Sequence, residues 1–381
     1  MKDISNIRSE IDGIDEELVR LIKRRLEIVE DVAASKKERG APVTDPARER
    51  DILSRVTGAV GPELENGVRL IFSTMFGVSR ARQRAVLHPN SKLIADIEAA
   101  RRDTPKFPTR AVVACSGTEG SYAQIATSLI FPTPTILFFN SFEKVFESVE
   151  KGLCPYGVLP IENSAAGSVA AVYDLMVKHH FHVVKALRLK VDHVLLGVPG
   201  AKLSDVRTVA SHPHALAQCG GFLKSHSEMK VVPETNTAVA AKNLSASGDA
   251  TRAVIASRAC AELYGLEVLA EGIADASFNY TRFICISKNL EILPDARKIG
   301  IMLSLPHRPG ALNGIIAKFA AIDVNLTKLE SRPLPGMDFE FRFTFEFEAQ
   351  PSDPQVLKLL AEIAADPEIE HFAFLGAYPE N

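Results

Sequence analysis

Residues 4–32, ISNIRSEIDGIDEELVRLIKRRLEIVEDV, carry apolar side chains at a steady alternation of three and four residues. This period is typical of one long amphipathic helix, which we expect to end near residues 40–42 (Gly-Ala-Pro). The run Thr44-Asp45-Pro46 supplies a capping residue followed by proline, so a second helix is predicted through about Val56. A third is predicted from about Glu63 to Leu87. Residues 1–90 are therefore predicted to be an all-helical domain.

The pattern of apolar residues that predicts secondary structure changes twice after residue 90. Residues 91–108 begin with a short helical pattern and become a charged, proline-bearing linker. Short β-branched runs then alternate with helical segments over 109–290, which predicts an α/β domain. Strands are expected at 111–115, 156–160, 191–198, 208–210 and 281–287, and helices at 121–130, 141–149, 169–178, 215–223 and 237–244. From residue 298 the pattern reads βαββαβ, a ferredoxin-like order. Within it, alternating phenylalanines at 339–347 predict a strand with one apolar and one solvated face.

Length and composition narrow the class of protein. The 381 residues correspond to two or three domains, and 46% hydrophobic with 24% charged residues indicates a globular chain. A net charge of −3 argues against a general binder of nucleic acid or anionic membranes. We find no apolar run long enough to span a bilayer and no signal peptide, so we expect a cytoplasmic protein. The five cysteines are scattered and are expected to be reduced.

A cation interrupts the apolar seam of the first helix. Steps of seven from Ile4 lead to Arg25, where packing favours leucine, and Arg8 and Lys36 lie on the flanking stripe. Arg25 either pairs with an acidic neighbour, extends to solvent, or binds an anion. Arg8 and Arg25 are about 25 Å apart along a helix, so a shared small ligand would need Arg8 from a second chain.

The order of polar residues in the helical domain resembles that of the helical chorismate mutases. The pattern includes Asp15 and a run from Asp45 to Arg50. The resemblance implies an intertwined dimer that binds chorismate inside the bundle. It implies that the site residues are Arg8, Arg25, Lys36, Asp45, Arg48, Glu49, Ser79 and Gln83.

The roles implied by this resemblance are electrostatic. Arg25 and a second chain's Arg8 would hold carboxylates, with Arg48 as a further cation. Lys36 and Gln83 would bond the ether oxygen, and Glu49 and Asp45 the hydroxyl and its neighbours. A unimolecular Claisen rearrangement needs a compact conformer and positive charge by the breaking C–O bond, so no metal or cofactor is expected.

A second group of motifs lies in the α/β domain. Residues 117–122 form a glycine-rich strand-to-helix turn, which is either a plain tight turn or an anion site. Further polar motifs follow at 160–164, 211–218, 234–237 and 279–283. In this order they resemble the prephenate dehydratase domain. The resemblance implies two lobes like a type 2 periplasmic binding protein, with substrate in the cleft between them.

The dehydratase resemblance assigns roles residue by residue. Thr281 is the threonine of the TRF motif and is expected to be a hydrogen-bond donor to the departing hydroxyl, with Glu162 as a candidate acid. The expected catalytic residues are Glu162, Asn163, Ser211, Gln218 and Thr281, and the expected substrate contacts are Ser121, Tyr122, Ser164, Arg282 and Phe283. The nearby histidines are expected to have surface or supporting roles, because a proline separates His212 from His214 and no cysteine is near.

The C-terminal region contains Arg308-Pro-Gly-Ala-Leu312 and Leu329-Glu-Ser-Arg-Pro333. These runs resemble motifs of the ACT regulatory domain of prephenate dehydratases, in which paired domains bind phenylalanine. The implied binding residues are Gly310, Ala311, Leu312, Glu330, Ser331 and Arg332. A glycine at a helix start lets backbone N–H groups reach a carboxylate, which favours a binding role for Gly310; the alternative is a glycine that only turns the chain.

Together, the three resemblances predict a bifunctional chorismate mutase and prephenate dehydratase, at least dimeric, that makes phenylpyruvate and is inhibited by phenylalanine. Two alternatives stay open. One is an arogenate dehydratase that gives phenylalanine directly. The other is a non-catalytic sensor of aromatic acids or amino acids, against which the retained Arg25, Lys36, Glu49 and Thr281 argue.

Overall fold

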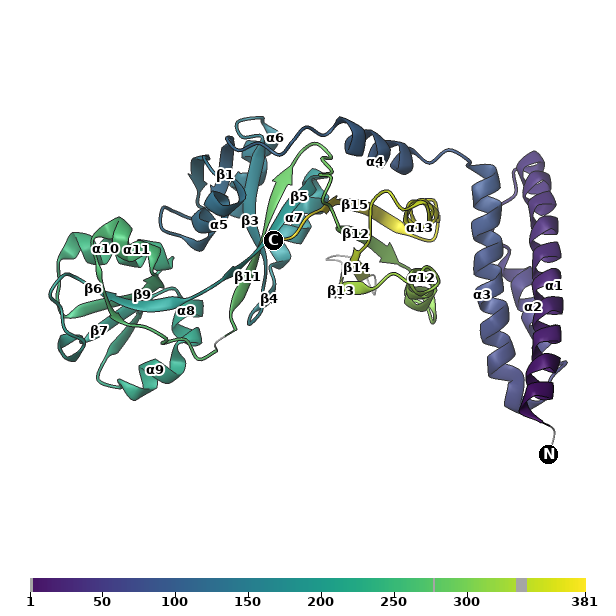
Figure 1. The fold of residues 1–381 in the computed structure, drawn as a ribbon, viewed down its shortest axis with the longest axis horizontal. Coiled ribbons are helices and arrows are strands. Elements are labelled where there is room, and N and C mark those ends of the chain that lie inside the picture. Colours follow the sequence, from purple (N-terminus) through teal and green to yellow (C-terminus); the bar gives the residue numbers. More distant parts are fainter. Residues whose placement is uncertain (1–2, 277, 334–340) are drawn as a thin grey trace. The chain divides into compact units, whose positions relative to one another are not determined.

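The computed structural model describes residues 3–276, 278–333 and 341–381 (Figure 1). The chain folds into two compact units. The first comprises Met1–Asp96, Met302–Phe345 and Ser352–Phe372, and the second comprises Ile97–Ile301, Glu346–Pro351 and Ala373–Asn381. Each unit is described by itself.

The N-terminal part of the first unit is helical, as predicted. It contains α1 (Ile4–Arg39), α2 (Pro46–Thr57) and α3 (Pro62–Leu87), and α3 packs against both of the others. Gly40, at φ 64°, ends α1 in the left-handed conformation that glycine adopts without strain. The Asp45 side chain accepts a hydrogen bond from the backbone N–H of Arg48 and so caps α2.

Few residues of helix α1 are buried in the single chain. Only Val29 and Ala33 of its residues are buried. Most of its apolar seam is exposed in the single chain: Ile4, Ile7, Ile11, Ile14, Leu18, Leu21, Ile28 and Val32. Single exposed apolar residues are normal on a protein surface, but a continuous stripe of this length is not. This face of α1 is therefore suited to packing against another protein surface.

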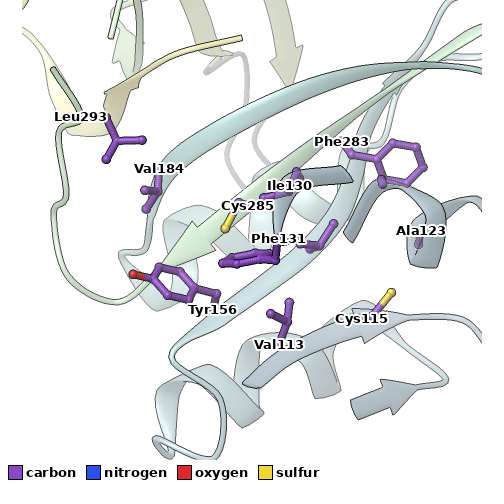
Figure 2. Packing of buried hydrophobic residues seen from close by; sticks show 12 residues of the cluster. Val113, Cys115, Ala123, Ile130, Phe131, Tyr156, Val184, Phe283, Cys285 and Leu293 are labelled. Atoms are coloured by element: carbon purple, nitrogen blue, oxygen red, sulfur yellow. The ribbon is translucent and has the colours of Figure 1, made fainter. Parts of the chain in front are cut away.

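Two sheets form the α/β part of the second unit. The first has the order β2-β1-β3-β11-β5, with the short β4 paired to β3. Its strands are β1 (Val112–Ser116), β2 (Thr135–Phe139), β3 (Tyr156–Asn163), β4 (Gly167–Ser168), β5 (His182–Lys190) and β11 (Tyr280–Ser287), and its helices are α5 (Tyr122–Ile130), α6 (Phe142–Glu150) and α7 (Ala170–His179). Side chains from β1, α5, β5 and β11 meet in its core (Figure 2).

The second sheet has the order β10-β6-β9-β7-β8. Its strands are β6 (His193–Gly197), β7 (Thr208–Ser211), β8 (Lys230–Pro233), β9 (Arg252–Ser257) and β10 (Glu267–Ala270). The short 3₁₀ helix η1 (Leu203–Asp205) precedes β7, and the α-helices are α8 (Pro213–Gln218), α9 (Gly220–Ser225), α10 (Thr237–Ser247) and α11 (Ala259–Tyr264). The two sheets make two lobes, and the chain passes between them from β5 to β6 and again from β10 to β11. The backbone N–H of Val191 donates to the carbonyl of Asn279 at 2.7 Å, which ties the two crossings together.

The C-terminal elements follow the predicted order βαββαβ. They are β12 (Lys298–Leu305), α12 (Ala311–Ala320), β13 (Leu326–Pro333), β14 (Phe341–Glu348), α13 (Pro354–Ala364) and β15 (Glu370–Tyr378), and the sheet order is β13-β14-β12-β15. The predicted solvated face of β14 is wrong, because Thr344 and Glu346 are buried together with Phe345 and Phe347. Phe339, at the start of the alternating run, lies outside the described residues.

Other local predictions also need correction. The short helical pattern predicted at the start of 91–108 is confirmed as the helix α4 (Lys92–Asp103), but this helix continues through Arg101 and Arg102, where the charged linker was expected. The helix expected over 215–223 is split into α8 and α9, because Cys219 has a non-helical backbone at φ −115° and ψ 25°. The sequence does not predict the strands β2, β4, β5, β8, β9 and β10.

Candidate active sites

The first candidate site surrounds Thr281 on β11. This strand runs antiparallel to β3, and Thr281 lies directly opposite Asn163. The Asn163 amide nitrogen, Nδ2, donates to the Thr281 hydroxyl oxygen at 2.9 Å. Thr281 and Asn163, both predicted as catalytic residues, are therefore brought together.

The orientation of the Asn163 amide is fixed by the turn that follows β3. Its Oδ1 accepts hydrogen bonds from the backbone N–H groups of Ala165 and Ala166, both at 3.0 Å. Its Nδ2 must then face Thr281, where it is a donor only. The Thr281 oxygen accepts this bond, so the hydroxyl proton is available for another acceptor. The geometry makes Thr281 a hydrogen-bond donor towards a ligand.

The contacts continue from this pair into the second lobe. Asn163 also donates to Asn279 Oδ1 at 3.0 Å, and Asn279 Nδ2 donates to Gln218 Oε1 at 3.0 Å. His193 Nε2 lies 3.0 Å from the same Gln218 oxygen. Burial lowers the pKa of His193, which favours the neutral ring. Gln218 was predicted as a site residue. His193 and Asn279 were not, although Asn279 stands in the same motif as Thr281.

Arg282 lies on the other side of β11 from Thr281. Its Nη1 contacts Glu346 Oε2 at 2.6 Å, its Nε contacts Glu380 Oε1 at 2.5 Å, and its Nη2 donates to the Tyr378 hydroxyl at 3.3 Å. Burial opposes the charge on the guanidinium, but Tyr378, Glu346 and Glu380 outweigh it and raise the pKa of Arg282. We call Arg282, Glu346, Tyr378 and Glu380 the Arg282 cluster. This placement corrects the prediction that Arg282 contacts substrate.

Glu162 shares the Arg282 face of the sheet. It pairs with Arg282 in the β3–β11 register, and its Oε2 lies 3.9 Å from Arg282 Nη1. Adjacent residues of a strand point to opposite faces, so Glu162 and the Thr281 hydroxyl are on opposite sides of the sheet. The geometry therefore does not support Glu162 as the acid that acts beside Thr281.

Four further predicted residues have structural partners. Ser211, predicted as a catalytic residue, is fully buried, and its hydroxyl donates to the carbonyl of Ile255. Phe283, predicted to contact substrate, belongs to the core of Figure 2. The Ser121 side chain caps α5. The Ser164 hydroxyl accepts the backbone N–H of Tyr280, which helps to fix the start of β11.

Tyr122 and the glycine-rich turn lie near the second-lobe residues. The Tyr122 hydroxyl donates to the carbonyl of Asp192 at 2.7 Å and is 3.4 Å from His193 Nδ1. Gly117 and Gly120 both adopt positive φ, 105° and 86°, so the turn needs glycine at both positions. This requirement explains the glycines by geometry alone.

The second candidate site lies between α1 and α3. Arg25 Nη1 donates to the Ser79 hydroxyl at 2.5 Å, and its guanidinium lies 5.9 Å from the centre of the Phe76 ring. Phe76, Ser79 and Gln83 are buried on one face of α3. Burial lowers the pKa of Arg25, which stays charged because no ordinary pH removes its proton. A half-buried cation beside polar, buried side chains is suited to an anionic ligand.

The other predicted residues of the helical site have varied positions. Lys36 Nζ donates to the carbonyl of Val43 at 2.5 Å, and Gln83 Oε1 is buried without a hydrogen-bond partner among the described residues. Glu49 pairs with Arg80. Arg48 pairs with Asp51 at 2.9 Å on the surface, and Arg8 is exposed. One chain thus assembles Arg25, Ser79 and Gln83 but leaves Arg8 outside.

The predicted phenylalanine residues lie at the start of α12 and on β13. Gly310 has φ 84° and precedes the first residue of α12, with Ala311 and Leu312 half-buried behind it. Glu330 contacts Lys328 at 3.3 Å and Arg332 at 2.9 Å, whereas Ser331 is exposed.

Three further features of the described part of the chain concern metal ligands, membrane-spanning helices and cysteines. No group of three or more His, Cys, Asp or Glu side chains in it is placed to hold a metal ion. None of its helices is both long enough and apolar enough to cross a membrane. All five cysteines are free and buried.

Two family models match this chain. The family model "Prephenate dehydratase" matches residues 113–291, and "Chorismate mutase type II" matches residues 7–84. A curated relative from Arabidopsis thaliana, "Arogenate dehydratase/prephenate dehydratase 1, chloroplastic", is 36% identical over 284 residues, which cover 70% of this chain and 71% of the relative. The chain belongs to the prephenate dehydratase family.

Solved structures share the fold of the same part of the chain. Prephenate dehydratase from Arthrobacter aurescens, solved with L-Phe, has a TM-score of 0.63 at 30% identity and covers 70% of this chain and 90% of its own. A protein described as the quorum-quenching acylase GqqA has a TM-score of 0.64 at 31% identity and covers 71% of this chain and 98% of its own.

A chorismate mutase domain and a prephenate dehydratase domain therefore occur in one chain. This member of the prephenate dehydratase family is a bifunctional enzyme of phenylalanine biosynthesis. It rearranges chorismate to prephenate and converts prephenate to phenylpyruvate.

Proposed function

We propose that Thr281 and Arg25 are the centres of the two reactions, and that phenylalanine lowers the dehydratase rate through the C-terminal elements. The observation that carries the dehydratase assignment is the Asn163 amide, which donates to the Thr281 hydroxyl and leaves its proton for the substrate. The test is the conversion of prephenate to phenylpyruvate by the purified chain, which should be strong and should depend on Thr281.

In the dehydratase reaction the bond from the ring to its carboxylate breaks, and its electrons complete the aromatic ring. The C–O bond to the ring hydroxyl breaks as CO₂ leaves, and one proton converts the departing hydroxide to water. Thr281 donates a hydrogen bond to this oxygen as negative charge develops on it. Solvent supplies the net proton, because a threonine hydroxyl is too weak an acid to lose its own proton.

In the mutase reaction the enzyme contributes conformation and positive charge. Arg25 holds a carboxylate of chorismate, and Lys36 and Gln83 donate to the ether oxygen as its bond to carbon breaks. Gln83 Oε1 is buried and has no hydrogen-bond partner among the described residues, which supports a role for this side chain in ligand binding, because buried polar atoms normally have a partner.

A second chain completes the helical site in this proposal. The exposed apolar stripe of α1 supports a paired helix, and Arg8 is too far from Arg25 along α1 to share a small ligand within one chain. Light scattering of the purified chain should give the mass of two or more chains, and a monomer would contradict the paired arrangement.

We propose an ACT domain for residues 298–381, on the βαββαβ order and the motifs around Gly310 and Ser331. The Arg282 cluster gives a physical connection for feedback. It joins the strand that carries Thr281 to Glu346 of β14 and to Tyr378 and Glu380 at the C-terminal end. The relative from Arthrobacter aurescens was solved with L-Phe, which supports this effector.

Replacement of Gly310 by valine is expected to abolish inhibition by phenylalanine while the uninhibited dehydratase rate stays within about twofold. The space around Gly310 is open, but φ 84° is strained for a β-branched residue, so the start of α12 must change its conformation. Dehydratase rates with and without phenylalanine measure the effect. Gly314→Val, in the same helix at an exposed position with open space, is the control. An unchanged response in Gly310→Val would contradict the assignment.

We propose prephenate as the preferred dehydratase substrate, because the mutase domain of the same chain produces it. The Arabidopsis relative is named for both arogenate and prephenate, so arogenate is the alternative. Rates on the two purified compounds distinguish them.

A further inference from the structure

Asn279 lies where the chain re-enters the first lobe from the second. Its carbonyl accepts the backbone N–H of Val191, in the other crossing, and only 3% of the residue is exposed. Its side chain contacts Asn163 of the first lobe and Gln218 of the second, at 3.0 Å each. It is therefore a direct side-chain link between the two lobes beside Thr281.

The direction of each hydrogen bond follows from the one before it. The backbone N–H groups of Ala165 and Ala166 hold Asn163 Oδ1, so Asn163 Nδ2 is the donor to Asn279 Oδ1. The Asn279 amide is then fixed with its Nδ2 towards Gln218, whose Oε1 must accept. An amide has one acceptor oxygen and one donor nitrogen, so no member of this series can turn over alone.

Gln218 is consequently held with its amide oxygen towards Asn279 and His193, which leaves its amide nitrogen as a donor. Its Oε1 is occupied by Asn279 Nδ2 and faces His193 Nε2 at 3.0 Å, which selects the neutral His193 tautomer with the proton on Nε2. These contacts use neither hydrogen of the Gln218 amide nitrogen. A ligand carboxylate or hydroxyl is the kind of acceptor that this nitrogen suits.

We propose that Asn279 is a positioning residue of the dehydratase reaction, which transmits the hydrogen-bond direction set at Asn163 to Gln218 and so presents the Gln218 amide to prephenate. This rests on the proposed function of the Thr281 site. Asn279 does not touch the reacting atoms. It acts through Gln218, whereas Thr281 is held by Asn163 directly.

The Asn279→Asp variant tests this positioning role, because aspartate has nearly the same size and shape as asparagine. A carboxylate still accepts from Asn163 but cannot donate to Gln218, so the Gln218 amide turns over and shows its oxygen to the substrate. We expect KM for prephenate to rise about tenfold or more while kcat stays within about threefold. The control is Asn243→Asp, which makes the same exchange at an exposed position of α10 and should change neither constant.

A double-variant experiment separates this role from general damage to the fold. In a Gln218→Ala background, Asn279→Asp should change KM less than twofold, because the side chain that it orients is gone. The mutase rate of the same chain and its melting temperature report folding. If Asn279→Asp is unfolded, Asn279→Ser, too short to reach Gln218 and uncharged, should show the same rise in KM.

Three results would overturn the proposal. Asn279→Asp could leave KM unchanged, or it could lower kcat at constant KM. In the Gln218→Ala background, it could raise KM by the same factor as in the native chain. If the wild-type chain turned over no prephenate, the proposed function itself would fail, which is a different outcome.

Discussion

Thr281→Val should lower kcat for the conversion of prephenate to phenylpyruvate about a thousandfold, at an almost unchanged melting temperature. Valine keeps the branched shape of threonine and the β-propensity of β11, but it has no proton to donate to the departing oxygen. Positioned donors to developing charge contribute about a hundred- to a thousandfold. Asn163 also loses its acceptor at 2.9 Å in this variant, which adds to the effect.

Thr281→Ser is the matched control for this prediction. Serine retains the hydroxyl and should recover most of the rate, within about tenfold of the native chain. The chorismate mutase rate should be the same in all three proteins, because Arg25 and Thr281 belong to different units. A Thr281→Val chain with a native dehydratase rate would show that the hydroxyl does not act on the substrate.

Arg25→Gln should lower the mutase rate about a thousandfold and leave the dehydratase rate unchanged. Glutamine still offers a hydrogen bond near Ser79 but removes the half-buried positive charge that an anionic substrate would pair with. Charge-assisted bonds of arginine to a carboxylate are stronger than neutral ones and frequently bidentate. The rate of chorismate loss measures the effect.

Arg24→Gln is the control for Arg25, since Arg24 is the neighbouring arginine on α1 and is exposed. It makes the same exchange outside the site and should keep the native mutase rate. Equal losses in both variants would indicate a general effect of the charge of α1 and would remove Arg25 from the proposed mechanism.

The long helices could be predicted from the sequence because their signal is local. The repeat in 4–32 extends over many turns, and Asp45-Pro46 marks a helix start directly. Strand β5 was missed because its pattern, His182–Lys190, mixes basic residues with apolar ones and is stabilised by its partner β11, about a hundred residues away. Short strands depend on such distant pairing more than on their own residues.

The sequence predicted part of the candidate dehydratase site but not the position of Arg282. Resemblance selected Thr281, Asn163 and Gln218, which the structure brings into one series of contacts. The position of Arg282 could not be predicted, because its principal partner, Glu346, is 64 residues away in the sequence and lies on a strand expected to have a solvated face. A charged residue within a motif indicates importance, but it does not tell whether the side chain meets a ligand or another part of the chain.

The most direct test follows chorismate loss and phenylpyruvate formation by the purified chain and by its Thr281→Val and Arg25→Gln variants. The native chain should convert chorismate to phenylpyruvate, Thr281→Val should stop at prephenate, and Arg25→Gln should leave chorismate largely unreacted while still consuming added prephenate. A native chain that leaves chorismate unchanged, or a Thr281→Val chain that forms phenylpyruvate at the native rate, would contradict the assignment of the two reactions to these two sites.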